Sequence, residues 1–175
     1  MTEQIVLGGG CFWCTEAAYQ LIKGIENVEP GYAGGKSTNP NYWNIHDPGS
    51  GHAEVVQITF NPDVISLQDI LDIFWVIHNP TTLNQQGNDT GPAYRSIILF
   101  NNDKQKNIIE QSLTEAQKVW DNEIVTEVSP LEKFFEAEPE HLNFYKNNPQ
   151  LGYCQVIINP KLAKLREKFS SRLKK

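Results

Sequence analysis

Two cysteines, Cys11 and Cys14, form a Cys-x-x-Cys pair directly after three glycines at residues 8–10. A short apolar run at residues 5–7 precedes the glycines, and apolar residues at helical spacing follow the pair, so Cys11 is predicted at the first turn of a helix that follows a strand. Free backbone N–H groups and the helix dipole stabilise a thiolate there, and a paired cysteine can lower the pKa of the first thiol further. Cys11 is therefore a candidate nucleophile.

The residues around Cys11 suit the approach of a substrate. The three glycines carry no side chains, so a ligand can come close to the backbone, and Phe12 and Trp13 supply an apolar wall. Each feature also has an ordinary structural explanation, because cysteines and adjacent aromatic residues often pack in cores and glycines often make turns. Their coincidence at one strand-to-helix junction favours a reactive site.

Glu54 is the candidate proton donor. It lies near the start of a strand predicted over residues 53–60, on the same face as Val56, Ile58 and Phe60. A carboxyl group on an apolar face loses hydration, which raises its pKa as a general acid requires. The alternative is a glutamate at a strand end that points to solvent.

The elements that must position these residues follow the order strand, helix, strand, strand, helix, strand. Strands are predicted over residues 4–7, 26–33, 53–60 and 96–100, with a fifth at 124–128, and helices over residues 11–24, 67–77 and 103–122. Two polar loops, residues 34–51 and 81–92, are long enough to be functional. This order predicts an α+β fold, specifically a ferredoxin-like α/β plait with a βαββαβ core in a two-layer sandwich.

The part of the chain beyond residue 130 is predicted as a C-terminal extension. It reads as an irregular wrap that ends in a short strand at residues 153–158 and a last helix. Basic residues alternate with apolar ones over residues 161–175, which favours a solvated helix docked by its apolar edge over a membrane or nucleic-acid arm.

The composition limits the class of protein. The 175 residues fit one catalytic domain, residues 1–175, with a sizeable core. A net charge of −6 argues against nucleic-acid binding. No apolar run approaches the roughly 20 residues that span a bilayer, and no signal-peptide pattern precedes the first strand, so a cytoplasmic location without membrane contact is expected. Three cysteines in a reducing compartment favour thiol chemistry.

Three other classes of protein fit parts of this pattern. A zinc site would use the cysteine pair and histidines, but no second ligand pair has compact spacing among His46, His52, His78 and His141. His52 is expected to be a loop residue, and His78 a helix-end residue near carbonyl groups that favour a cation. A thioredoxin-like oxidoreductase predicts Trp-Cys before the motif, where this chain has glycines. A non-catalytic binding module explains the loops but not the positioned cysteine pair.

The motif Gly10-Cys11-Phe12-Trp13 resembles the signature of the A-type peptide methionine sulfoxide reductases. Further motifs follow in family order to about residue 154, so the resemblance covers nearly the whole chain. They are Gly31-Tyr32-Ala33-Gly34-Gly35, Asn39-Pro40-Asn41-Tyr42, Gly51-His52-Ala53-Glu54, Gln86-Gly87-Asn88-Asp89 and Tyr94-Arg95-Ser96.

The resemblance implies a role for each matching residue. Cys11 corresponds to the nucleophile and Glu54 to the acid that protonates the sulfoxide oxygen. The other matching positions bind or orient the substrate: Phe12 and Trp13 as walls around the sulfoxide's methyl group, Tyr42 and Tyr94 as hydrogen-bonding hydroxyls, and Asp89 as a supporting carboxylate.

The resemblance also implies the reaction and the partners. The expected substrates are oxidised proteins or free methionine sulfoxide, with preference for the S epimer, and the expected intermediate is a sulfenic acid on Cys11. A second thiol then forms a disulfide, which thioredoxin, or dithiothreitol in vitro, reduces by exchange. No bound cofactor and no metal are expected, and the protein is expected to be a monomer.

The recycling thiol is where the chain departs from its relatives. Cys14 stands where many members have glycine, and the glycine-rich, cysteine-bearing tail of some members is missing. Cys154 follows a turn at residues 147–152 that reads as flexible, although its alternation with Val156 and Ile158 also fits a buried strand residue. We predict that this turn brings Cys154 to oxidised Cys11, which it attacks without relaxation of a helix, and that Cys14, whose helix would have to relax, then exchanges into the disulfide.

Overall fold

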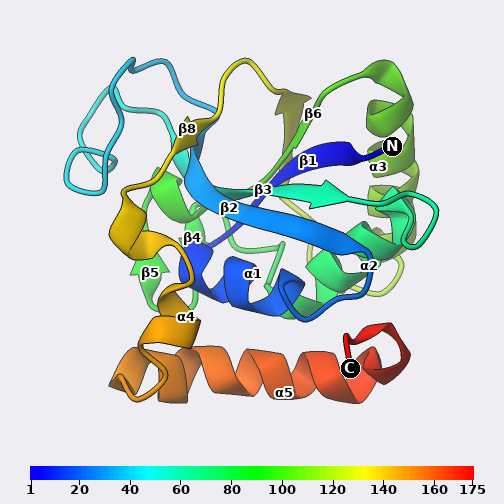
Figure 1. The fold of residues 1–175 in the computed structure, drawn as a ribbon. Coiled ribbons are helices and arrows are strands. Elements are labelled where there is room, and N and C mark those ends of the chain that lie inside the picture. The colour runs from blue at the N-terminus through cyan, green and yellow to red at the C-terminus, as the bar shows by residue number, and fades with distance from the viewer.

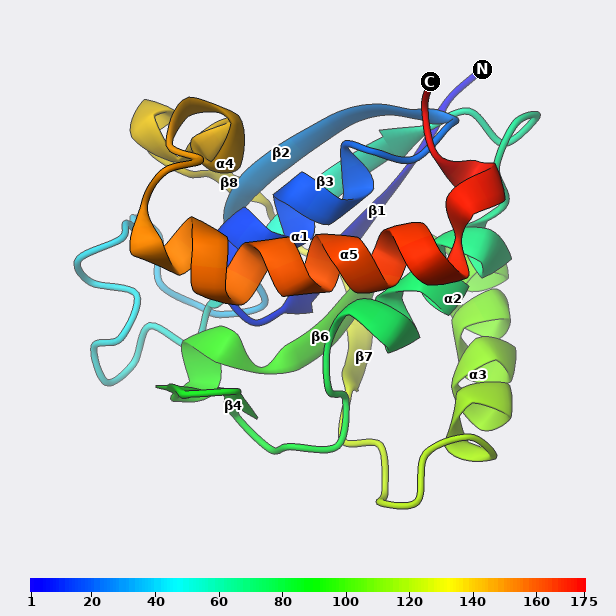
Figure 2. The same cartoon turned by 90° about the horizontal axis from the view of Figure 1, so that it is seen from below.

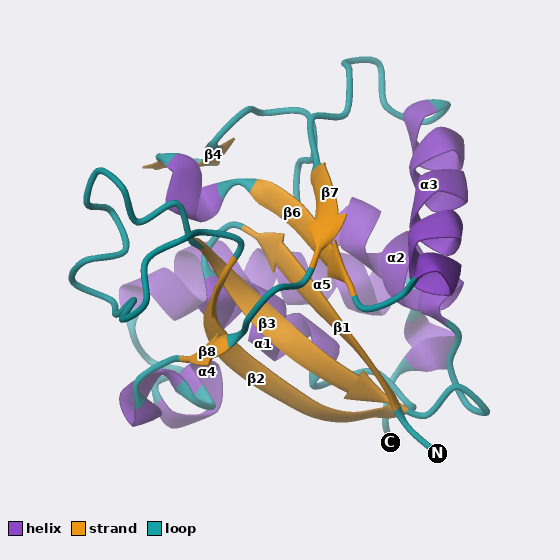
Figure 3. Cartoon of the chain, turned by 90° about the horizontal axis from the view of Figure 1, so that it is seen from above, coloured by secondary structure: helices purple, strands orange, loops and turns teal.

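The computed structural model describes residues 1–175, in which a six-stranded sheet has the order β7-β6-β1-β3-β2-β8. Neighbouring strands at its centre are all antiparallel, and at the edges β7 is parallel to β6 while β8 is antiparallel to β2. Figure 3 shows this sheet in orange. Its strands are β1 (Glu3–Gly9), β2 (Ile25–Ala33), β3 (Ala53–Phe60), β6 (Ser96–Phe100), β7 (Glu127–Pro130) and β8 (Phe135–Glu136).

The helices gather on one side of this sheet. Figure 1 shows α1 and α2 below the strands, and Figure 2, seen from below, shows α5 crossing over both of them. The helix α3 packs beside α2. The bounds are α1 (Phe12–Tyr19), α2 (Leu67–Ile77), α3 (Asp103–Gln117), α4 (Phe144–Asn147) and α5 (Asn159–Lys168). None of these helices combines the length and the apolar character needed to cross a membrane.

Shorter elements lie in the connecting segments. The loop after α2 holds a small two-stranded sheet, and single helical turns occur near residue 93 and in the C-terminal third. These elements are β4 (Gln85–Gln86), β5 (Asp89–Thr90), η1 (Pro92–Tyr94), η2 (Pro139–His141), η3 (Cys154–Ile158) and η4 (Ser170–Arg172).

The alternation of β3 divides its side chains between two cores. Val56, Ile58 and Phe60 belong to the large cluster between the sheet and the helices. Val55 belongs to a small cluster on the other face, which the segment between β7 and β8 covers through Leu131 and Phe134. This division confirms the predicted face of β3, so Glu54 points toward the helices and the start of α1.

Local signals set where α1 and α2 begin. Gly10 adopts φ +99°, a conformation that favours glycine, and a Cβ there would lie 2.6 Å from the side chain of Gln86. The chain therefore turns sharply from β1 into α1. Ser66 caps α2 by accepting a hydrogen bond from the backbone of Asp69, whose side chain in turn accepts one from the Ser66 backbone.

The structure corrects several predicted bounds. The first helix ends at Tyr19 instead of residue 24, because the chain turns there and Ile22 pairs with Leu173 in an isolated bridge. The third helix ends at Gln117, and the strand predicted at residues 124–128 is β7, Glu127–Pro130. These ends depend on tertiary pairing that helical periodicity does not contain.

The strand predicted at residues 153–158 is wrong, because this segment is the π-helical turn η3 that leads into α5. Cys154 and Ile158, four residues apart, are buried, whereas Val156 between them is 69% exposed. Buried residues four positions apart are typical of a helix. The apolar residues at 154, 156 and 158 alternate as in a strand, but only two of them are buried.

Candidate active site

Cys11 is the N-cap residue of α1, with φ −59° and ψ 127°. Its side chain is partly buried and lines a cavity of about 430 Å³ together with Cys14, Asp89, Tyr153 and Lys161. β1, the glycine turn and α1 thus place the sulfur of Cys11 at the edge of this cavity, which lies between the loop of Asp89 and the C-terminal segment. The placement predicted from sequence, at the start of a helix, is confirmed.

Glu54 lies beside the nucleophile. Its side chain is only 1% exposed, and its Oε1 accepts a hydrogen bond of 3.2 Å from the backbone N–H of Phe12. The pKa of Glu54 is raised to about 8, mainly by burial. The charge of Asp89 also raises this pKa, whereas the hydrogen bond from Phe12 lowers it. Glu54 therefore carries a proton at neutral pH, as the predicted apolar face implies.

The two thiols of the Cys-x-x-Cys pair interact directly. Burial raises the pKa of Cys11 well above its ordinary value, and the hydrogen bond with Cys14 and the charge of Glu54 raise it further. The hydrogen bond from Cys11 lowers the pKa of Cys14 to about 7 despite burial. The prediction that the helix N-terminus lowers the pKa of Cys11 is therefore wrong, because loss of hydration outweighs the helix dipole. Of the two thiols, Cys14 therefore ionises more readily.

The loops bring two tyrosines toward this site. Burial raises the pKa of both Tyr42 and Tyr94, and both feel the charges of Glu54, Cys11 and Asp89. Both phenols are therefore protonated and can donate hydrogen bonds into the site.

An aromatic group forms the wall next to Cys11. The indole of Trp13 stacks on Phe144, with ring centroids 3.7 Å apart, and its N–H donates a hydrogen bond of 3.0 Å to Nδ1 of His141. The ring of Tyr42 is stacked at 6.3 Å on Trp13. Phe12 is fully buried, packing at 5.1 Å from His141, so Trp13 presents the exposed part of the wall and Phe12 supports it from the core.

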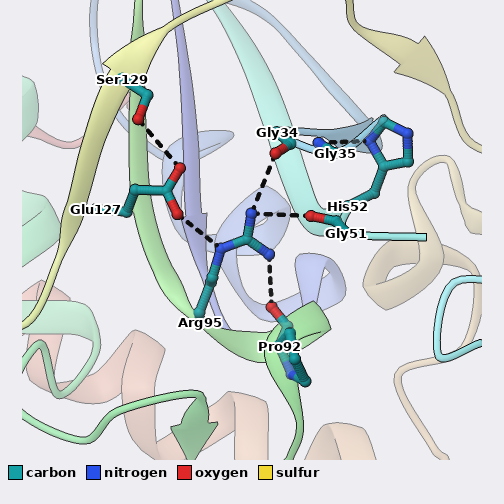
Figure 4. Close-up of polar contacts among 8 residues, drawn as sticks. All are labelled: Gly34, Gly35, Gly51, His52, Pro92, Arg95, Glu127 and Ser129. Carbon is teal, nitrogen blue, oxygen red and sulfur yellow. Dashed lines mark hydrogen bonds and ion pairs between the residues drawn. The ribbon is translucent and has the colours of Figure 1, made fainter. Parts of the chain in front are cut away.

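Arg95 joins the loop that carries Tyr42 to the helical turn η1 that carries Tyr94 (Figure 4). Its guanidinium donates to the carbonyl oxygens of Pro92 at 2.9 Å, Gly51 at 3.0 Å and Gly34 at 3.4 Å, and its Nε pairs with Glu127 at 3.1 Å. One planar cation thus fixes both ends of the loop at residues 34–51 to the end of the loop at residues 81–92.

The C-terminal wrap fixes the site from the other side. The carboxylate of Glu138 accepts hydrogen bonds from the hydroxyl of Tyr32 at 2.8 Å and from the backbone N–H of Tyr42 at 2.9 Å. Glu16 of α1, which is buried, accepts one of 3.0 Å from the backbone N–H of Asn143. Glu138 and Glu16 therefore attach the loop of Tyr42 and the segment of Phe144 to the body of the protein.

Sequence reasoning missed the contributions of Tyr153, Lys161, Glu138 and Arg95 to the site. Tyr153 and Lys161 lie in a segment that was predicted as a strand and a solvated helix, and Glu138 lies in the wrap. Arg95 stands in one of the quoted family motifs, and this was the only signal that pointed to it.

Of the four histidines, His141 packs against Phe12 and Trp13 between the two cysteines, whereas His52 and His78 bond to other parts of the chain. His52 bonds to Gly35 and Ser37 in the loop, as predicted for a loop residue. His78 bonds to the Phe74 carbonyl and to Ser96, and burial lowers its pKa to about 3, so it is neutral. The prediction that helix-end carbonyls favour a cation at His78 is therefore wrong, since desolvation is the stronger effect.

Comparison with known proteins places the chain in one family. The family described as peptide methionine sulfoxide reductase matches residues 3–173. The chain is 49% identical over 172 residues to the peptide methionine sulfoxide reductase MsrA of Saccharolobus solfataricus, covering 98% of this chain and 97% of that protein.

Two solved structures of Mxr1 from Saccharomyces cerevisiae are also similar. The reduced form has a TM-score of 0.83 and 36% identity, covering 87% of this chain and 89% of that chain. The complex of Mxr1 with Trx2 has a TM-score of 0.60 and 29% identity, covering 82% and 84% of the two chains. With matches over nearly its full length, the chain belongs to the A-type peptide methionine sulfoxide reductases and is an enzyme of that class.

Proposed function

We propose that this chain reduces the S epimer of methionine sulfoxide, protein-bound or free, through a sulfenic acid on Cys11 and an intramolecular disulfide that thioredoxin reduces. The observation that carries this proposal is the hydrogen bond from the Phe12 backbone to Glu54, which holds a protonated carboxyl group next to the nucleophile. Reduction of a sulfoxide needs this pair, because the oxygen must be protonated as sulfur is attacked.

In the first step, Glu54 protonates the sulfoxide oxygen, with Tyr42 and Tyr94 as further hydrogen-bond donors. The Cys11 sulfur bonds to the substrate sulfur, and the thiol proton passes to the Cys14 thiolate, which is its hydrogen-bond partner. The oxygen then moves to Cys11, giving methionine and Cys11 sulfenic acid.

The substrate-binding roles follow from the same arrangement. Trp13, backed by Phe12 and Phe144, gives the methyl group of the substrate an apolar surface. Asp89 borders the cavity and helps to keep the carboxyl group of Glu54 protonated by raising its pKa.

For recycling, the geometry favours Cys14 as the first partner of Cys11. Cys11 is the N-cap and Cys14 is three residues on, about one helical turn away, and the two thiols interact through a hydrogen bond. Cys154, the first residue of η3, is fully buried in the same core cluster as Cys14. The relay through Cys154 stays a prediction that a single variant tests.

The proposed reductant is thioredoxin, and support comes from the solved complex of the related Mxr1 with Trx2. We also propose that residues 1–175 form one monomeric catalytic domain whose core is a ferredoxin-like plait. The antiparallel order β6-β1-β3-β2 supports this, because it is the order that a βαββαβ plait produces.

The test is the reduction of separated S and R epimers of methionine sulfoxide by the purified chain with dithiothreitol. Methionine is expected from the S epimer only, and thioredoxin with its reductase should replace dithiothreitol. Equal turnover of both epimers, or none of either, would contradict the proposal.

A further inference from the structure

The C-terminal segment brings two polar groups to Cys14 that the first reaction step does not use. The hydroxyl of Tyr153 lies 3.6 Å from the Sγ of Cys14. Lys161, in the first turn of α5, lines the same cavity as Cys11 and Cys14. The two groups come from residues that lie about 140 positions beyond the cysteine pair in the chain, so only the tertiary fold joins them.

Their spacing shows that one face of the C-terminal helical segment borders the cavity. Tyr153, Ile157 and Lys161 recur every four residues and all line the cavity. The adjacent face, with Cys154, Ile158, Leu162 and Leu165, is buried in the core. The buried face therefore sets the rotation of the segment, and this rotation turns Tyr153 and Lys161 toward the thiols.

Several titratable groups act on Cys14, some favouring and some opposing a thiolate there. The hydrogen bond with Cys11 lowers the pKa of Cys14 most, burial raises it, and then Lys161 and Tyr153 lower it while Asp89 raises it. Glu54 and Cys154 also interact with Cys14. Lys161 is the only cation in this set, which otherwise contains Cys11, Glu54, Asp89, Tyr153 and Cys154.

Tyr153 acts as a donor in this arrangement. Burial raises its pKa, and the neighbouring charges of Cys11 and Cys14 raise it further, so the phenol keeps its proton. A neutral phenol can donate a hydrogen bond to a thiolate and still keep its own proton.

We propose that Tyr153 and Lys161 are positioning residues that hold Cys14 as a thiolate for attack on the Cys11 sulfenic acid. This inference rests on the proposed function. In that step the electron pair of the Cys14 thiolate forms the S–S bond, the S–O bond of the sulfenic acid breaks, and the oxygen leaves as hydroxide, which takes a proton to become water. Both cysteines end as one disulfide, and no further oxidant is needed.

The step needs such support because Cys14 has accepted a proton from Cys11 in the first half-reaction. A thiol with an ordinary pKa would hold that proton at neutral pH and would attack slowly. A neighbouring ammonium group and a phenol that donates to sulfur favour its release.

Lys164 provides a matched control. It lies one turn further along α5 and is exposed, and it borders a neighbouring pocket that Lys161 also lines, but not the cavity of the thiols. Lys161→Met and Lys164→Met remove the same charge from the same helix, but only the first removes it from the cavity of the thiols. Lys161→Arg keeps the charge.

The first measurement is a titration of the reduced variants without substrate. Ultraviolet thiolate absorbance gives the titration curve, and pH-dependent alkylation with iodoacetamide, located by mass spectrometry, assigns Cys14. Lys161→Met and Tyr153→Phe are each expected to raise the midpoint for Cys14 by about one pH unit, which lowers its thiolate fraction at pH 7 about fivefold. Lys161→Arg and Lys164→Met should titrate like the wild type.

The second measurement is the rate of disulfide formation after one equivalent of methionine sulfoxide. Lys161→Met should slow it about fivefold and still release one methionine per enzyme. The titration uses no substrate, so it tests the inference independently of turnover. Failure to release methionine would overturn only the proposed function. If Lys161→Met and Tyr153→Phe both titrate like Lys164→Met, the inference is overturned. Circular dichroism checks that each variant is folded. If Lys161→Met is unfolded, the titration of Tyr153→Phe alone decides whether the inference holds.

Discussion

The carboxyl group of Glu54 and the backbone N–H of Phe12 are joined by a hydrogen bond of 3.2 Å between residues 42 positions apart. This contact connects the buried end of β3 to the first turn of α1, so the acid and the nucleophile keep a fixed relation. Any change in the strand or in the helix start alters both groups together.

The first prediction concerns the acid. Glu54→Gln keeps the shape of the side chain and removes its proton, so the first half-reaction should slow by the ~10²–10⁴-fold typical of a lost general acid. In the wild type, the single-turnover rate should fall as pH rises through about 8, where Glu54 loses its proton. The variant should lack this fall. Wild-type single-turnover rates in Glu54→Gln would place the acid elsewhere, with Tyr42 and Tyr94 examined next.

The second prediction concerns stability and pH. The pKa of Glu54 is about 8 in the folded protein and ordinarily 4.5, so the folded state binds this proton more tightly than the unfolded state. Its contribution to the free energy of unfolding is full below pH 4.5 and is lost as pH rises to about 8. Glu54→Gln should therefore gain stability over the wild type between pH 5 and pH 8, as measured by urea unfolding at both pH values. A constant difference would contradict the raised pKa.

The third prediction concerns the nucleophile. Cys11→Ser should lose sulfoxide reduction and stay folded, because a serine hydroxyl is a far poorer nucleophile than a thiolate. Methionine release in single turnover measures this, and Cys154→Ser, which should release one methionine per enzyme, is the control. Methionine release by Cys11→Ser would disprove the mechanism.

The fourth prediction separates the two recycling routes. Cys14→Ser should release one methionine per enzyme, more slowly than the wild type because the acceptor of the Cys11 proton is missing, and should then stop with thioredoxin because it lacks the resolving thiol. If Cys14 resolves the sulfenic acid alone, Cys154→Ser cycles with thioredoxin at the wild-type rate. If the relay operates, Cys154→Ser turns over poorly as well, and multiple-turnover assays with thioredoxin distinguish the two.

The fifth prediction concerns Arg95, whose side chain is 13% exposed. Arg95→Met leaves three carbonyl groups and the carboxylate of Glu127 without their partner, which should cost about 2–3 kcal/mol of unfolding free energy. The loops of Tyr42 and Tyr94 should also loosen, so the single-turnover rate should fall. Lys118→Met removes an exposed ion pair with Glu115 and should change stability by less than about 0.5 kcal/mol. Equal losses in the two variants would contradict this role of Arg95.

The sequence by itself determined the features that depend on near neighbours. The run of strand, glycines and helix placed Cys11 at the start of a helix, and the alternation of β3 placed Glu54 on its apolar face. In each case one local conformation suits the residue types at fixed spacing, so a few neighbouring residues contain the information.

Only the tertiary structure decided which of the two thiols has its pKa lowered and what surrounds it. Desolvation at Cys11 and the contact between Cys14 and Tyr153 depend on packing between residues 139 positions apart. The apolar alternation around Cys154 predicted a strand, but contact with the core made it helical and turned Tyr153 and Lys161 toward the cavity. Burial and charge act through space, so the pKa of a thiol follows from the whole fold and not from its motif.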